Sequence, residues 1–147
     1  MKNKLLIALF TTCLAMTATA QDKMNEKDLP AAVKTGFKNE FPNAKTVEWK
    51  MKEGKYKAKF EVNGINQIAS FGKDGKLIAK GMRIRQSEIP TPVATAVKSA
   101  YANRTIDHVY RVDKNGAAHY LIKLDGEPET KLQYTANGQV ATEKMDF

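Results

Sequence analysis

Apolar residues first recur along the chain with the period of an α-helix. Val33, Phe37 and Phe41 lie four residues apart, so on a helix they form one apolar stripe that faces a core. Asp28 and Thr91 each precede such a stripe and stand near a proline, a combination typical of a helix start. The stripe returns 60 residues later as Val93, Val97 and Tyr101. The pattern predicts two equivalent helices.

After each predicted helix the apolar period changes to two, the period of a half-buried strand. Residues 47–62 alternate apolar and charged side chains around a turn at Glu53-Gly54. Further turn signals divide both copies into short strands: Asn63-Gly64, Asp74-Gly75, Asn115-Gly116, Asp125-Gly126 and Asn137-Gly138. We therefore predict an α+β fold of two tandem repeats, each one helix followed by a four-stranded antiparallel meander.

The two predicted repeats span residues 21–86 and 87–147. One helix and one small sheet cannot bury both faces of that sheet, so we expect the repeats to form one compact domain. No segment after residue 20 is long and apolar enough to cross a membrane. We expect a monomer without a transmembrane segment.

Residues 1–20 have the pattern of a signal peptide. Two lysines precede a short apolar run, and Ala18-Thr19-Ala20 offers a cleavage site of small residues. We expect removal of this segment and a periplasmic or secreted location. The single cysteine, Cys13, lies within it, so the remaining chain has no thiol for catalysis or for disulfide bonds.

Several predicted caps, turns and core positions resemble those of a known family. They are Leu29-Pro30, Phe41-Pro42-Asn43-Ala44, Asn63-Gly64 and Asp74-Gly75-Lys76, and the second repeat carries less similar copies of them. On these residues the chain resembles the secreted PepSY-like family, whose fold is compared with that of the β-lactamase inhibitor protein. The resemblance implies one curved eight-stranded sheet with the helices on one face. It also implies an inhibitor or binding module, but no binding residue carries over, because the matching positions are structural in kind.

The chain offers little for catalysis. After residue 20 it contains two histidines, His108 and His119. By strand alternation His108 is in phase with Tyr110, whereas His119 is out of phase with Tyr120, so we expect the two rings to point to opposite faces. No further ligands stand at the spacing of a metal site, and no glycine-rich phosphate loop follows a strand. We expect no catalytic residue, no cofactor and no metal.

Charge is shared unevenly between the two repeats. Residues 21–86 carry 15 Lys or Arg and 8 Asp or Glu, a net charge of +7, whereas residues 87–147 carry 7 and 8, a net charge of −1. Part of the excess is a group of lysines that alternation places opposite the apolar side of their strands: Lys50, Lys52, Lys57 and Lys59. Such a face either keeps the sheet soluble and unaggregated or docks an acidic partner.

We predict that these four lysines bind a partner. The chain would then be an exported, non-enzymatic module that inhibits or escorts an envelope or secreted protein, with an acidic protein as the partner. The alternative is a binder of a small anionic ligand, a glycan or a lipid headgroup through the same basic face. We expect no nucleic acid partner, because export separates the chain from it and because aromatic residues do not interleave with the lysines.

Overall fold

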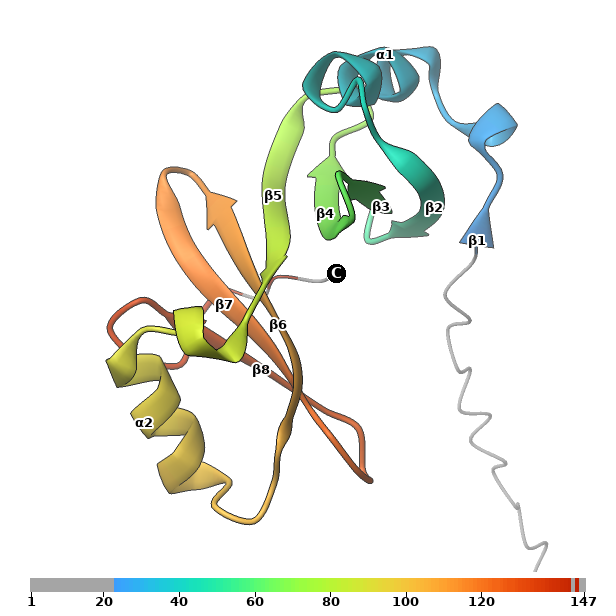
Figure 1. Ribbon diagram of the computed structural model, residues 1–147. Helices are drawn as coiled ribbons and strands as arrows, with labels where there is room; N and C mark the ends of the chain where they lie inside the picture. Colours follow the sequence, from blue (N-terminus) through green and yellow to red (C-terminus); the bar gives the residue numbers. More distant parts are fainter. Residues whose placement is uncertain (1–22, 144, 146–147) are drawn as a thin grey trace, which may run out of the picture.

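The computed structural model describes residues 23–143 and 145 of the 147-residue chain. The predicted signal peptide, residues 1–20, lies outside the described residues. Eight strands of the described part form one antiparallel sheet, in which each strand pairs with the next along the chain (Figure 1). The strands are β1 (Lys23–Met24), β2 (Lys45–Lys52), β3 (Lys55–Val62), β4 (Ile65–Phe71), β5 (Leu77–Ile84), β6 (Ile106–Lys114), β7 (Ala117–Leu124) and β8 (Thr130–Thr135). The helices are α1 (Ala31–Glu40) and α2 (Thr91–Ala100), which follow the 3₁₀ turns η1 (Glu26–Asp28) and η2 (Gln86–Glu88).

Both helices begin beside a proline, but not with the caps that the sequence suggested. Pro30 is the N-cap of α1, and its carbonyl accepts hydrogen bonds from the N–H groups of Val33 and Lys34 at 3.0 and 3.1 Å. Asp28 instead ends the turn η1, and Thr91 is the first residue of α2. Proline suits the start of a helix because its missing N–H would have no partner there.

The α+β class and the single eight-stranded sheet are confirmed, with one difference in how the strands are distributed. The second repeat supplies three strands, and Val140 then makes only an isolated bridge to Tyr134. The eighth strand comes from the other end of the described chain. There, β1 pairs Met24 with Trp49 at the free edge of β2.

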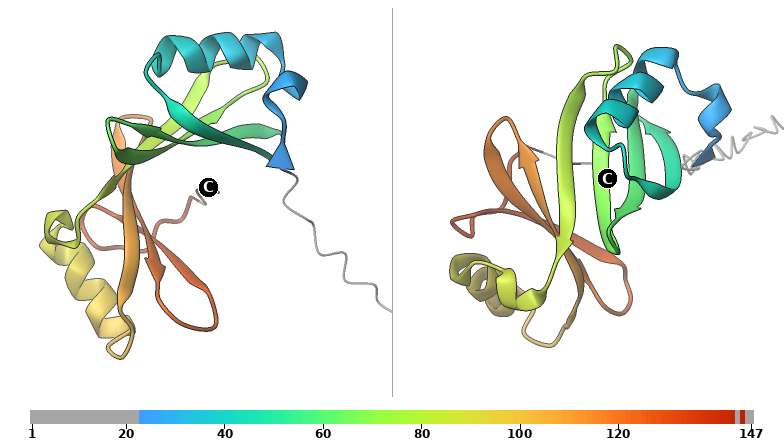
Figure 2. Two further views of the ribbon diagram at one scale, coloured as in Figure 1. Left: turned by 45° about the vertical axis from the view of Figure 1, so that its right-hand side comes forward. Right: turned by 45° about the horizontal axis from the view of Figure 1, so that its top comes forward.

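Strand register places both helices on the same face of the sheet. Trp49, Phe60 and Phe71 belong to the core under α1, and Val109 and Ile122 belong to the core under α2. The two cores lie on one side of the sheet because of how β5 pairs with β6. Figure 2 shows the sheet bent between its two halves, with both helices on the outer side. The face without helices, which we call the helix-free face, is therefore concave.

The β5–β6 pairing joins the two repeats across a close contact. Gly81 of β5 lies opposite Val112 of β6. A Cβ atom at Gly81 would lie 2.7 Å from Cγ2 of Val112 and 3.2 Å from Cγ1 of Ile68. The absence of a side chain at Gly81 thus lets the centre of the sheet close over these two apolar groups.

An aromatic cluster fixes α1 on the sheet. The Phe37 ring lies edge-on to Trp49 and Phe60, with ring centroids 4.9 and 5.0 Å apart. On the same helix, Gly36 meets the turn between β4 and β5, where a Cβ atom would lie 2.1 Å from the carbonyl oxygen of Gly75. The helix backbone and the turn backbone are therefore in direct contact.

We predict that Gly36→Ala destabilises the protein although alanine is the better helix former. Helix propensity favours alanine by about 1 kcal/mol. Overpacking against a backbone carbonyl costs roughly 1–3 kcal/mol, and more where the backbone cannot move. Urea unfolding should show a net loss for Gly36→Ala and no loss for the control Thr35→Ala, whose side chain is exposed on the same helix. Equal stability of the two variants would contradict this packing.

Candidate functional site

The helix-free face carries a strip of apolar side chains that neither helix covers. Four of them are buried: Ile68, Ala79, Tyr110 and Val112. Leu121 packs against them and is half-buried. Met145, which follows β8 in the chain, lies against this strip and is only 5% exposed. The strip is therefore closed in part by the end of the described chain rather than by a helix.

A pocket of about 260 Å³ opens on the same face. Its wall combines apolar side chains of the strip with basic side chains of both repeats. The lining residues are Lys50, Lys59, Ile68, His108, Tyr110, Leu121, Ile122, Lys123, Glu129, Lys131, Leu132, Gln133 and Met145. Because Lys50, Lys59 and Ile68 come from the first repeat and the others from the second, the pocket lies between the repeats.

The four lysines singled out in the sequence lie on the helix-free face, but their exposure differs. Lys59 is exposed, and Lys50 and Lys52 are half-buried. Lys57 is only 7% exposed, contrary to the expectation of an open basic face. Register sets Lys50 opposite Lys57 and Glu48 opposite Lys59. Lys50, Lys52 and Lys57 also interact with other groups of the protein. Their role in binding stays a prediction.

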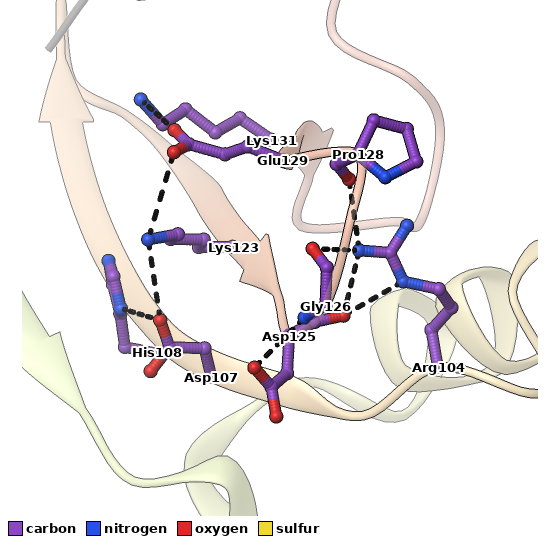
Figure 3. A network of polar contacts seen from close by, with 9 residues as sticks. All are labelled: Arg104, Asp107, His108, Lys123, Asp125, Gly126, Pro128, Glu129 and Lys131. Atoms are coloured by element: carbon purple, nitrogen blue, oxygen red, sulfur yellow. Dashed lines mark hydrogen bonds and ion pairs between the residues drawn. The ribbon is translucent and has the colours of Figure 1, made fainter.

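Across the pocket, charged groups of the second repeat form a network of ion pairs (Figure 3). The carboxylate of Asp107 lies 3.2 Å from Nδ1 of His108 and 3.6 Å from Nζ of Lys123. The carboxylate of Glu129 lies 4.0 Å from Lys123 and 2.7 Å from Lys131. This network holds cationic side chains at the pocket wall, in addition to Lys59 on the opposite side.

Arg104 fixes the loop that carries Glu129. Figure 3 shows its guanidinium directed at the backbone between β7 and β8. It donates hydrogen bonds to the carbonyl oxygens of Asp125 (2.7 and 2.9 Å), Gly126 (3.0 Å) and Pro128 (3.2 Å), and to Oγ1 of Thr130 (3.1 Å). The planar, multidentate guanidinium suits this role. No sequence pattern predicts this role of Arg104, because all but one of its partners are backbone atoms.

The two histidines lie on the same face, which corrects the prediction from alternation. His108 lies opposite Lys123, and His119 lies opposite Val112 of the apolar strip. The prediction was wrong because Tyr110 lies on the helix-free face, whereas Tyr120 belongs to the core under α2. The register of β6 also shifts between Ile106 and His108, so Ile106 packs under α2 and is out of phase with His108. The rings are separated along the strands and do not form a shared site.

Burial and neighbouring charges shift the pKa values at the pocket. Burial lowers the pKa of His108 below its ordinary value, and the carboxylate of Asp107 opposes this shift. The hydrogen bond from Lys131 lowers the pKa of Glu129. At neutral pH the His108 ring is therefore neutral, and the charges at the pocket come from lysines and carboxylates.

The residues that the structure describes form neither a metal site nor a membrane-spanning helix. No three His, Cys, Asp or Glu side chains there come together in a way that could hold a metal ion. No helix of that part of the chain is long and apolar enough to cross a membrane.

The bent antiparallel sheet with both helices on its outer face defines an α+β protein built from one sheet and one helical layer. A family model described as "Putative beta-lactamase-inhibitor-like, PepSY-like" matches residues 15–79 and 55–142, and the chain belongs to this PepSY-like family. The resemblance inferred from the sequence is thus confirmed. The family's description points to a binding or inhibitor-like module. A comparison with curated proteins gives no match.

Solved structures of Bacteroides proteins share the fold. A DUF2874 family protein from Bacteroides ovatus ATCC 8483 is 27% identical, with 76% of this chain and 84% of that chain covered and a TM-score of 0.62. A protein from Bacteroides eggerthii DSM 20697, described among "putative periplasmic proteins", is 22% identical, with 76% and 85% covered and a TM-score of 0.65. A "BLIP-like protein" from Bacteroides fragilis NCTC 9343 is 20% identical, with 77% and 83% covered and a TM-score of 0.57.

The shifted pKa of His108 gives a prediction. A nuclear magnetic resonance titration of its ring, assigned with a His108→Gln variant, should give a midpoint below the ordinary value of 6.5. Asp107→Asn should lower the midpoint further, since the Asp107 carboxylate favours the protonated ring. The unfolded chain takes up this proton at a higher pH than the folded chain. Protonation therefore favours unfolding, and stability falls as the pH drops from 6.5 through the folded pKa. A midpoint at or above 6.5 would contradict the burial of the ring.

Proposed function

We propose that this chain is an exported, non-enzymatic module that binds an acidic envelope or secreted protein through its helix-free face, and so inhibits or escorts that protein. The observation that carries the proposal is the concave surface itself: an apolar strip and a pocket lie between basic side chains, on the side that the helices leave open. A family described as beta-lactamase-inhibitor-like supports a binding role.

Shape and size support a protein as the partner. The face spans both repeats, and apolar side chains at its centre with charged side chains around them resemble the arrangement of protein interfaces. A partner that fits the concave surface would bury the strip and meet the surrounding charges. Contacts of this kind give affinity from the apolar centre and specificity from the charged rim.

Charge supports an acidic partner. Lys59 is exposed at one side of the pocket, and Lys123 and Lys131 stand at the other. Glu129 neutralises only part of this charge, because among the residues that the structure describes it is the single carboxylate that lines the pocket. The four lysines predicted from the sequence belong to the proposed surface, and Lys59 is the most accessible of Lys50, Lys52, Lys57 and Lys59.

An exported location is part of the proposal. It is supported by the signal-peptide pattern in residues 1–20 and by the description of a structural neighbour as periplasmic. The division into repeats of residues 21–86 and 87–147 is likewise proposed from the internal similarity of the sequence.

The experiment is capture of a partner from envelope extract, followed by association kinetics with charge-reversed variants. Lys50→Glu combined with Lys59→Glu should slow association about tenfold at low salt and less at high salt, because steering by charge is screened. The matched control combines Lys38→Glu with Lys98→Glu, two exposed lysines on α1 and α2. This control changes net charge equally and should leave the rate close to that of the unmodified chain. Equal rates for the two double variants at low salt would overturn the proposed surface.

A second candidate, a small organic anion, is favoured by the pocket between the repeats. An apolar wall with lysines beside it suits a ligand that has both a hydrocarbon part and an anionic group. An anilinonaphthalene sulfonate dye has this chemistry and should bind the folded chain in a one-to-one ratio. Lys123→Glu should weaken that binding, and Lys38→Glu should not. Absence of saturable binding to the folded chain would contradict this candidate.

A further inference from the structure

The chain places a segment of its own on the helix-free face. After β8, residues 139–143 and 145 turn back beside the sheet, and we call them the return segment. The N–H of Ala141 donates to the carbonyl of Gln133 at 2.9 Å, and Val140 bridges Tyr134. The segment thus begins as an added partner of β8 and then reaches the apolar strip.

The side-chain amide of Gln133 binds the backbone of the return segment with a donor and an acceptor, as a neighbouring strand would. The N–H of Met145 donates to Oε1 of Gln133, and Nε2 of Gln133 donates to the carbonyl of Met145, both at 2.8 Å. This pair of bonds satisfies one donor and one acceptor of the Met145 backbone. Gln133 therefore offers a docking point that an extended peptide backbone of any sequence could use.

The return segment also supplies a carboxylate to a nearly buried lysine. Glu143 pairs with Lys114, whose side chain is only 11% exposed. The hydrogen bond from Lys114 lowers the pKa of Glu143, and the charges of His119 and Lys55 act in the same direction. An ammonium group so little exposed to water requires a counter-charge, which Glu143 provides.

Met145 fills the apolar part of the site. Its side chain packs with Ile68, Tyr110 and Val112, and it is one of the residues that line the pocket. It is the second residue after Glu143 in the sequence, so two nearby positions of the chain supply the carboxylate for the lysine and the apolar side chain for the strip. The segment makes the three kinds of contact expected of an acidic partner on this face: backbone, carboxylate and apolar side chain.

The face retains polar groups that the described residues leave without a hydrogen bond. They are Oγ of Ser70 and Nδ1 of His119, both buried. Ser70 lies opposite Ala79, and His119 lies opposite Val112, so each stands beside a residue of the apolar strip. Buried polar atoms without partners carry a free-energy cost, which the face bears with the return segment in place.

We propose that the return segment is an internal ligand, and that the helix-free face is built to bind an extended segment with a carboxylate two residues before an apolar side chain. A partner segment of this kind displaces the return segment. The inference rests on the proposed function, because it names the chemistry of the partner for that same face. It adds that the unmodified chain binds such a partner more weakly than a chain whose return segment is released.

The test uses the full chain and a labelled peptide of residues 139–147 as the probe, with binding read by fluorescence anisotropy. Met145→Asp releases the return segment, because a carboxylate cannot be buried against the strip. The peptide should bind this variant about tenfold more tightly than the unmodified chain, since the site is then vacant for a larger fraction of the time. Met82→Asp is the matched control: it makes the same chemical change at an exposed methionine on the helix side of β5. It should bind the peptide as weakly as the unmodified chain.

Two further variants keep the test decisive. Glu143→Lys replaces Met145→Asp if the latter fails to fold, because position 143 is exposed and its reversal turns the ion pair with Lys114 into a repulsion that releases the return segment. A peptide that itself carries Met145→Asp should lose binding to either released chain. Equal affinity of the peptide for the unmodified and released chains, or no binding to either, would overturn the inference.

The outcome separates this inference from the proposed function. In one outcome, the peptide fails to bind the released chains while partner binding is still weakened by Lys50→Glu and Lys59→Glu. This result would overturn only the inference that the return segment is an internal ligand. If the peptide binds but the association rate of the partner is unchanged by Lys50→Glu and Lys59→Glu, the proposed partner surface is overturned instead.

Discussion

The pairing of β5 with β6 is the constraint on which the rest of the structure depends. It joins two helix-and-meander repeats into one sheet in a register that puts both apolar cores on the same side. The pairing brings Val112 against Gly81, which already lies opposite Ile68 of β4, and no side chain could be accommodated at Gly81 without displacing these two residues. With both helices committed to one face, the second face has no helix to cover it. A bent sheet with an open concave side follows directly.

The open face would be a liability if it were only apolar, because exposed apolar sheet surfaces favour aggregation. Here the apolar strip is narrow and is bordered by lysines and ion pairs, and Met145 covers part of it. The arrangement keeps the face soluble while leaving a surface that a complementary partner can bind. Under the proposed function, the same charges serve both solubility and binding, so the two interpretations of the lysines in the sequence are compatible.

Sequence patterns predicted the fold well where a single alternation runs through a strand. Trp49, in phase with the other apolar residues of its hairpin, is buried as expected. They failed where a strand buries apolar residues on both faces: Tyr110 packs on the helix-free face, so His108, in phase with it, lies on the same face as His119. The docking of the return segment has no sequence pattern. It depends on one apolar side chain, that of Met145, and on the side-chain amide of Gln133, which binds the Met145 backbone. A contact between distant residues through their side chains does not repeat at regular intervals along the sequence, so only the structure shows it.

We propose that partners bind the helix-free face and not the helices. The most direct test is methyl nuclear magnetic resonance of the full chain, with the captured partner added. We expect shifted or broadened methyl signals for Ile68, Leu121 and Met145 on the helix-free face. The signals of Val33 and Val97, buried beneath the two helices, should stay in place. Changes at the two valines with none at the other three would contradict the account.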